Sequence, residues 1–136
     1  MERKPPMPMC RCFLVCRQIL LDQFTQEHVL LGPTHQFVAF TFPVVADLSI
    51  YVRCTSVQGS YSLEVQLQDL EGNVLWRHQF QPPLEAHDPL MVGILNLQRL
   101  GIYFPKPGKY EFVLLANGEE VVRDVFWARL PNQPVT

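Results

Sequence analysis

YSLEVQLQ, at residues 61–68, alternates apolar and polar side chains without interruption, and VLWRHQF follows at residues 74–80. The residues between them, DLEGN at 69–73, are types that favour turns. Alternation with a period of two is typical of a strand that has one face in the core and one in water. Residues 61–80 therefore predict two antiparallel strands joined by a tight turn.

Similar signals recur along most of the chain. Asn117-Gly118 is the strongest short hairpin signal, because both residue types tolerate positive φ. Residues 22–28 indicate a polar connection, and residues 98–104 allow at most one helical turn. The other segments predicted to be extended are bounded by turn residues. They are residues 9–17, 29–32, 36–42, 47–54, 90–97, 110–115 and 121–130.

Many short strands with almost no helix predict an all-β fold. We expect a two-sheet antiparallel Greek-key sandwich, either immunoglobulin-like or jelly-roll-like. The step Pro-Gly-Lys-Tyr at 107–110 fits the tyrosine found at a Greek-key corner. A chain of 136 residues has the length of one domain. We expect residues 1–8 to form a disordered tail, residues 9–130 a single β-sandwich domain and residues 131–136 a second tail.

Composition narrows the classes of function. Only 18% of the residues are charged while 48% are hydrophobic, so some apolar surface is expected to face a partner or a second copy. The net charge of −2 and the scattered basic residues argue against nucleic-acid binding. No apolar run is long enough to span a bilayer, and Arg11 and Arg17 interrupt the apolar N-terminal segment, unlike a signal peptide. A cytoplasmic setting with reduced thiols is expected.

Four cysteines, Cys10, Cys12, Cys16 and Cys54, raise the question of a metal site. A C-x-C spacing suits a soft metal ion. In a strand, however, Cys10 and Cys16 lie about 20 Å apart, so three thiols do not converge on one ion. We therefore expect Cys10, Cys12 and Cys16 to be buried packing residues, with a metal or redox role as the alternative.

Motifs for catalysis are missing from the sequence. The four histidines, His28, His35, His78 and His87, do not occur at metal-ligand spacings. None of the serines lies in a G-x-S-x-G elbow, and the isolated glycines build no phosphate-binding loop. The DLEGN turn lacks the length and the distal glutamate of a calcium loop. We predict no enzyme activity, no metal and no cofactor.

The first and last predicted strands, residues 9–17 and 121–130, are apolar on both faces. On the first, a period of two places Cys10, Cys12, Leu14 and Cys16 on one face and Arg11, Phe13, Val15 and Arg17 on the other. One face of the last strand carries Arg123, Val125, Trp127 and Arg129. If these strands are neighbours, the arginine-containing faces form an apolar patch with a cationic rim, suited to self-association or to a protein partner. The alternative is that both faces are simply buried.

Five segments carry a resemblance to known proteins. They are FLVCRQ (13–18), VLLG (29–32), IYVRCT (50–55), YSLEVQLQDLEGNVL (61–75) and LNLQRLGIYFPKPGKYEFVLLANGEEV (95–121). In this order the segments resemble an uncharacterised family of small bacterial β-sandwich proteins, over about residues 10–130. The resemblance implies the sandwich fold and a cytoplasmic, bacterial setting. It implies no catalytic residue.

Three classes of function follow, in order of preference. The first is a non-enzymatic β-sandwich interaction or scaffold module. The second is a small-ligand or carbohydrate-binding sandwich, which requires an open, aromatic-lined cleft at one end of the sheets. The third is an enzyme whose site is carried by loops.

Overall fold

The structure is a computed structural model, and it describes residues 7–56, 58–86 and 93–132. All of the regular secondary structure within these residues is β-strand, which confirms the all-β prediction. The strands are β1 (Met9–Cys16), β2 (Gln18–Leu21), β3 (His28–Leu31), β4 (Gln36–Val38), β5 (Val44–Thr55), β6 (Gly59–Tyr61), β7 (Leu63–Gln68), β8 (Val74–Gln79), β9 (Leu84–Ala86), β10 (Gly93–Phe104), β11 (Gly108–Ala116) and β12 (Glu119–Arg129).

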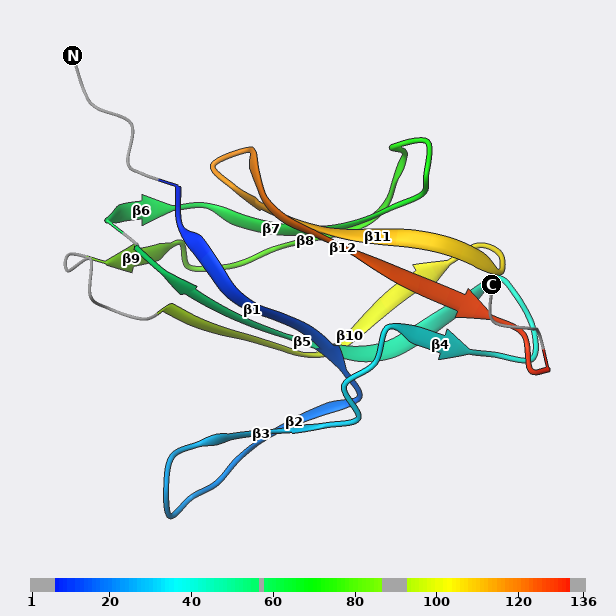
Figure 1. The fold of residues 1–136 in the computed structure, drawn as a ribbon, viewed down its shortest axis with the longest axis horizontal. Helices are drawn as coiled ribbons and strands as arrows, with labels where there is room; N and C mark the ends of the chain where they lie inside the picture. The colour runs from blue at the N-terminus through cyan, green and yellow to red at the C-terminus, as the bar shows by residue number, and fades with distance from the viewer. Residues whose placement is uncertain (1–6, 57, 87–92, 133–136) are drawn as a thin grey trace.

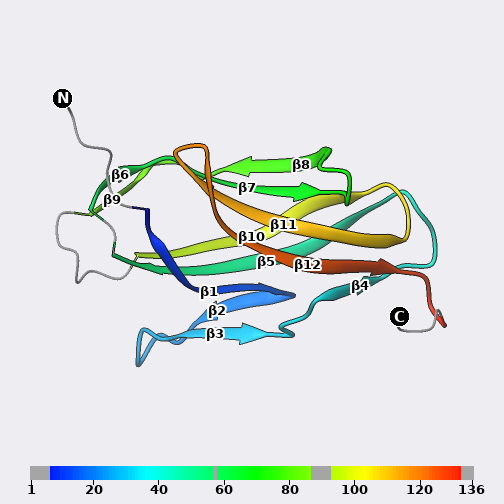
Figure 2. The same cartoon turned by 45° about the horizontal axis from the view of Figure 1, so that its top comes forward.

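Two larger sheets enclose the core (Figures 1 and 2). One has three strands in the order β1-β5-β10, and the other has five in the order β4-β12-β11-β7-β8. The strands β2 and β3, and likewise β6 and β9, form small two-stranded sheets. The pair β4–β12 is parallel, with Gln36 opposite Trp127. The five-stranded sheet is therefore mixed, and the prediction of two purely antiparallel sheets is wrong on this point. The parallel pairing was not predicted because it spans only three residues and leaves no pattern in the sequence.

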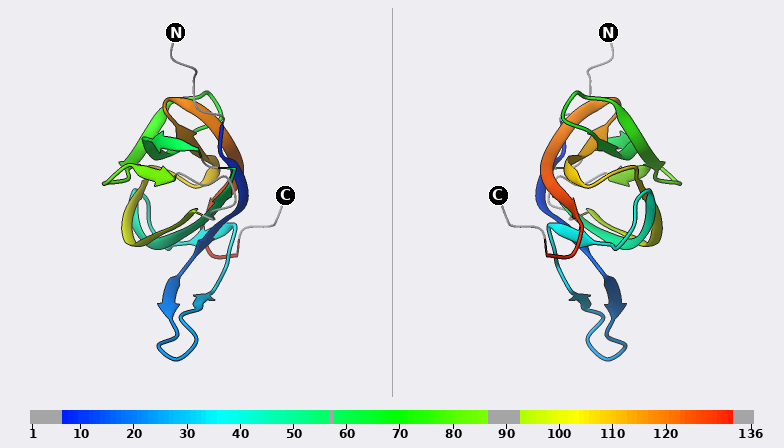
Figure 3. Two further views of the ribbon diagram at one scale, coloured as in Figure 1. Left: turned by 90° about the vertical axis from the view of Figure 1, so that its left-hand side faces the viewer. Right: turned by 90° about the vertical axis from the view of Figure 1, so that its right-hand side faces the viewer.

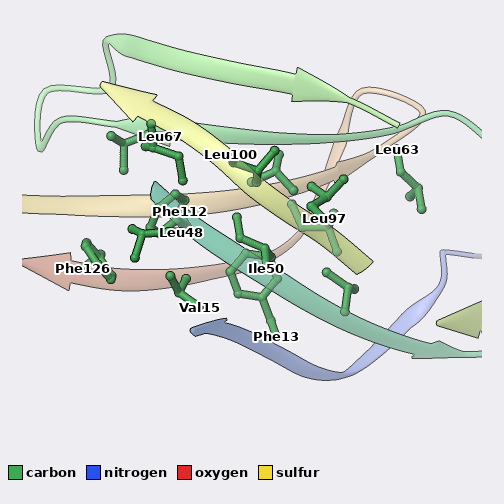
Figure 4. Close-up of a cluster of buried hydrophobic side chains, with 14 of the residues drawn as sticks. Phe13, Val15, Leu48, Ile50, Leu63, Leu67, Leu97, Leu100, Phe112 and Phe126 are labelled. Atoms are coloured by element: carbon green, nitrogen blue, oxygen red, sulfur yellow. The ribbon is translucent and has the colours of Figure 1, made fainter. Parts of the chain in front are cut away.

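Side chains from both large sheets meet in one hydrophobic core (Figure 4). Leu63, Val65 and Leu67 of β7 are fully buried, as their alternation with polar residues predicts. Aromatic rings form the centre: Phe126 stacks on Phe104 with 5.7 Å between ring centroids and meets Phe112 edge to face at 5.2 Å. Such ring pairs contribute about 0.5–1.5 kcal/mol each beyond the area they bury.

A β-bulge interrupts β1 between Cys10 and Cys12. Cys10 lies opposite Cys54, but Cys12 lies opposite Arg53, so Arg11 is an extra residue without a partner position. An inserted residue exchanges the two faces of the strand beyond it. Phe13, opposite Val52, therefore faces the core. Cys12, Leu14 and Cys16 share a face as predicted, but the prediction that Cys10 shares it is wrong, because a period of two does not detect the bulge.

Strand β10 contains a second bulge, between Leu97 and Leu100, where Arg99 has a φ of 55°. The strand continues through it to Phe104, opposite Val44. Residues 98–104 form no helical turn, within the limit of one turn that the sequence allowed, since pairing with β5 keeps this segment extended. Of the strand predicted at 90–97, residues 90–92 lie outside the described residues.

Residues 1–6 and 133–136 of the predicted tails lie outside the described residues, while Pro8 is buried next to β1. At the start of β11, the Tyr110 hydroxyl donates a hydrogen bond to the backbone carbonyl of Lys106. A hydroxyl bonded to backbone a few residues upstream is the contact expected of a corner tyrosine.

Neighbouring residues in β1 test the bulge through stability. Phe13 is 8% exposed and Leu14 is 38% exposed. We predict that Phe13→Ala lowers the free energy of unfolding by about 3 kcal/mol, while Leu14→Ala lowers it by less than about 1 kcal/mol. Urea unfolding followed by circular dichroism measures both. A larger loss for Leu14→Ala would show that β1 presents the opposite face to the core.

Candidate interaction surface

Strands β2 and β3 form a hairpin, residues 18–31, that we call the arm. Gln18 lies opposite Leu31 at its root, and Leu21 lies opposite His28 near its tip. The tip is closed by Asp22, whose Oδ1 accepts hydrogen bonds from the backbone N–H groups of Phe24 (2.8 Å) and Thr25 (3.3 Å). Figure 3 shows the tip of the arm projecting beyond the two large sheets.

One face of the arm attaches it to the three-stranded sheet. Ile19 on this face is almost completely buried. The His28 ring lies 5.6 Å from the Tyr51 ring of β5, centroid to centroid. The His28 Nε2 lies 2.7 Å from Nδ2 of Asn96 in β10; we assign Asn96 as the donor and Nε2 as the acceptor. Strand residues from β5 and β10 thus hold the inner face of the arm.

The root of the arm depends on a close approach at Gly32. The Arg17 backbone N–H donates to the carbonyls of Leu31 (3.0 Å) and Gly32 (3.3 Å). Gly32 has a φ of +66°, and a Cβ there would lie 3.1 Å from Cγ and Cδ of Arg17. Glycine is therefore the residue that fits this turn without strain.

The other side and the tip of the arm are apolar and exposed. Leu20, Val29 and Leu31 share the outer face, and each is 41% exposed. Leu21 is 52% exposed, and Phe24 at the tip is 98% exposed. Large exposed side chains gathered on one projecting element are typical of an interaction site.

The outer face of the three-stranded sheet is also partly apolar, but its charges are basic. Met9, Leu14 and Ile94 are exposed there. Strands β1, β5 and β10 contribute three exposed arginines and a single acidic residue; these are Arg11, Arg53, Arg99 and Asp47. The arm, in contrast, carries Asp22 and Glu27 and no lysine or arginine. The two surfaces therefore differ in the sign of their charge.

The N-terminal half of the patch predicted from sequence does not form an exposed apolar surface. Phe13 and Val15, expected at its centre, are 8% and 7% exposed and point into the core (Figure 4). This expectation is wrong, because the bulge turns both side chains inward. Arg11 is exposed at the bulge, where its Nε donates to Oγ1 of Thr55 (3.0 Å), and Arg17 lies at the root of the arm.

The C-terminal half of that patch lies on the outer face of the five-stranded sheet. Val125 and Trp127 are half-buried there, with Lys109 Nζ 5.8 Å from the Trp127 ring centroid. The guanidinium of Arg129 donates to Oε1 of Gln36 (2.7 Å). A role of these β12 residues in binding stays a prediction, and they do not join Phe13 in one surface.

Arg123, the fourth β12 residue of the predicted patch, forms ion pairs within the chain. Its Nη2 lies 2.7 Å from Glu120 and its Nη1 lies 3.1 Å from Glu111. Hydrogen bonds to Glu120, and then to Glu111, raise the pKa of Arg123. Exposed ion pairs of this kind add little to the stability of the fold. They do, however, pair the guanidinium of Arg123 with carboxylates of its own chain, whereas the patch hypothesis pairs it with a partner protein.

A ligand site requires a hollow, and two hollows lined by described residues are candidates. One, of about 270 Å³, lies beside the root of the arm and is lined by Arg17, Thr34, Gln36, Phe37, Val38, Asp47 and Leu48. The other, of about 350 Å³, lies between β8 and β10, where His78 packs between Trp76 and Phe80. Its volume is at the lower end for a small-molecule site. Ligand binding there stays a prediction.

The part of the chain that the structure describes has neither a metal-binding cluster nor a membrane-spanning helix. Within it, no group of three or more His, Cys, Asp or Glu side chains could hold a metal ion. Among these same residues, no helix is long and apolar enough to cross a bilayer. His87 lies outside the described residues.

Comparison with known proteins places the chain in a family. Residues 11–126 match a family of unknown function, DUF6941. The chain belongs to DUF6941. Membership confirms the resemblance to an uncharacterised β-sandwich family and covers most of the domain. No curated protein matches the chain.

Several solved structures match this DUF6941 member, and one of them matches over most of the chain. It is an immunoglobulin-like protein from Pseudomonas aeruginosa, 9% identical in sequence, and the match covers 92% of this chain and 98% of that chain. The TM-score is 0.45, too low for any argument from that protein.

Sequence patterns missed the arm, although a signal was present. The apolar runs Ile19–Leu21 and Val29–Leu31 have similar lengths and flank a polar segment, as two strands of a hairpin do. Only the second run was predicted to be extended. Residues 22–28 were predicted correctly to connect them, apart from His28, which begins β3.

The contact between His28 and Asn96 predicts how the arm is held. We expect His28→Ala to speed amide hydrogen exchange in β2 and β3 about tenfold, because the loss of one hydrogen bond makes local opening of the arm easier. Exchange of core amides in β5 and β11 is expected to stay unchanged. His35→Ala is the control, because His35 is exposed outside the arm. Unchanged exchange in the arm of His28→Ala would show that this contact does not hold it.

Proposed function

We propose that this domain is a non-enzymatic self-association module. In this proposal the arm of one copy binds a second copy on the part of the outer face of the three-stranded sheet that the second copy's own arm leaves uncovered, around Met9, Leu14 and Ile94. The observation that carries it is the exposure of the arm, with Phe24 at 98% and the face formed by Leu20, Val29 and Leu31 at 41% each.

Apolar burial supplies the driving force. Complete burial of a valine, leucine or phenylalanine side chain stabilises by about 1.5–3 kcal/mol. The arm offers five such side chains, all partly or fully exposed; they are Leu20, Leu21, Phe24, Val29 and Leu31. Burying these side chains in an interface offsets the translational and rotational entropy that two chains lose when they associate.

Charge complementarity supports a second copy as the occupant. The arm carries the acidic residues Asp22 and Glu27, and the sheet face carries exposed Arg11, Arg53 and Arg99 around its own apolar side chains. One chain thus bears both members of a complementary pair. Two copies related by a two-fold axis make both contacts at once, which gives a closed dimer.

The proposal also includes three more specific predictions made from the sequence. They are the Greek-key sandwich topology, a scaffold role in a bacterial cytoplasm, and the absence of enzyme activity. The Tyr110 contact supports the first of them. An unrelated protein partner for the arm is an outcome that the following experiment also detects.

A charge exchange tests self-association. We predict that Glu27→Lys on the arm and Arg53→Glu on the sheet each weaken the dimer about tenfold or more, because each places like charges opposite one another. Mixing the two variants restores association, since both contacts between unlike copies again pair opposite charges. Sedimentation velocity over a concentration series measures each dissociation constant.

Two further variants complete the design. Phe24→Ser is expected to weaken the dimer by removing apolar contact, while Glu71→Lys, in the exposed turn between β7 and β8, is expected to have no effect. A wild-type chain that stays monomeric at about 100 μM contradicts the proposal, as does a variant mixture that associates no better than either variant alone. A monomer whose arm variants lose another protein would indicate an unrelated partner.

A further inference from the structure

The bulge in β1 brings two cysteines directly opposite each other. Cys10 of β1 pairs with Cys54 of β5, and both side chains face the inner side of the three-stranded sheet. Directly opposed residues of an antiparallel pair have Cα atoms about 4.5–5.5 Å apart, within the range of about 4.4–6.8 Å that a disulfide requires. The register alone therefore permits a bond between them.

The other two cysteines are arranged differently. Cys12 lies opposite Arg53 and Cys16 lies opposite Ser49, so both belong to the outer side of the sheet. Burial raises the pKa of each of these thiols, which lowers their reactivity at neutral pH. None of the four cysteines forms a disulfide in the structure.

Cys10 and Cys54 differ from each other in access and in protonation. Cys10 is partly exposed, whereas Cys54 is fully buried. A hydrogen bond from the Cys54 thiol lowers the pKa of Cys10 to about 7, helped by the backbone of Cys12 and opposed by burial. The same hydrogen bond, followed by burial, raises the pKa of Cys54. Cys10 is thus both the more accessible thiol of the pair and the one whose pKa is lowered, which favours it as the nucleophile.

We propose that Cys10 and Cys54 are a peroxide-oxidisable pair, in which Cys10 reacts with hydrogen peroxide and Cys54 then closes a disulfide between β1 and β5. Transient disulfides of this kind are the ones expected in a reducing compartment. The inference is independent of self-association, because these thiols face the inner side of the sheet and the arm-binding surface is its outer side.

The two steps balance. The Cys10 thiolate attacks one oxygen of hydrogen peroxide, the O–O bond breaks, and the departing hydroxide takes up a proton as water, leaving a sulfenic acid on Cys10. Cys54 then attacks the Cys10 sulfur, the S–O bond breaks, and the hydroxide leaves as water with the Cys54 proton. Two thiols are oxidised to one disulfide, and one peroxide is reduced to two waters.

The first step prepares the second. The negative charge of the Cys10 thiolate is among the causes that raise the pKa of Cys54. Conversion to the neutral sulfenic acid removes that charge and the hydrogen bond to it. Cys54 therefore loses its proton more easily once Cys10 is oxidised.

Arginines in the sequence allow a direct test on the full chain. Trypsin cleaves after Arg11, Arg17 and Arg53, which puts Cys10, the pair Cys12/Cys16, and Cys54 in three different peptides. After treatment with hydrogen peroxide and alkylation of remaining thiols, we expect mass spectrometry to find the peptide ending at Arg11 linked to the peptide beginning at Cys54. The rate of linkage should rise with pH with a midpoint near 7, and a dithiol reductant should reverse it.

Variants separate the two roles. Cys54→Ala is expected to stop at a sulfenic acid on Cys10, trapped by dimedone on the peptide ending at Arg11, while Cys12→Ser still forms the disulfide. The wild-type result needs no variant, so a misfolded Cys54→Ala does not remove the test. Unmodified Cys10, a Cys10 oxidised without a link to Cys54, or a link from Cys10 to Cys12, Cys16 or a second chain would each overturn the proposal.

Discussion

The extra residue Arg11 in β1 decides which side chains of the first strand enter the core. Side chains of a strand alternate between its two faces, so one inserted residue exchanges the faces from that point onward. Cys10, before the bulge, faces Cys54, and Phe13 and Val15, after it, face Val52 and Ile50. Without the bulge, Phe13 and Val15 would be exposed if Cys10 kept its position. The core, the cysteine pair and the outer face of the sheet all depend on this one position.

The arm follows from where β1 ends. Beyond Cys16 the chain turns back across the outer face of its own sheet and buries Ile19 there, while His28 contacts Tyr51 and Asn96. A two-stranded hairpin has two faces, and the sheet covers only one of them. The uncovered face remains apolar, so the geometry that anchors the arm also leaves the surface on which the proposed self-association depends.

Local patterns predicted the parts of the fold whose partners are close in sequence. The alternation of Leu63, Val65 and Leu67 identified β7, and Asn117 and Gly118 both have the positive φ that the hairpin turn requires. The bulge at Arg11 depends on pairing with β5, distant in sequence, and so had no local signal. The predicted interaction patch failed at Phe13 and Val15 for that reason. The arm was missed because four-residue strands are too short for a period to be recognised.

The register of β1 against β5 is measured most directly by NMR, from nuclear Overhauser effects between backbone protons across the two strands. Our account predicts cross-strand contacts between Cys10 and Cys54 and between Phe13 and Val52, with no such partner for Arg11. An uninterrupted ladder starting from Cys10 and Cys54 would instead place Cys12 opposite Val52 and Phe13 opposite Tyr51. Contacts of that second kind would contradict the account, because Phe13 would then face outward.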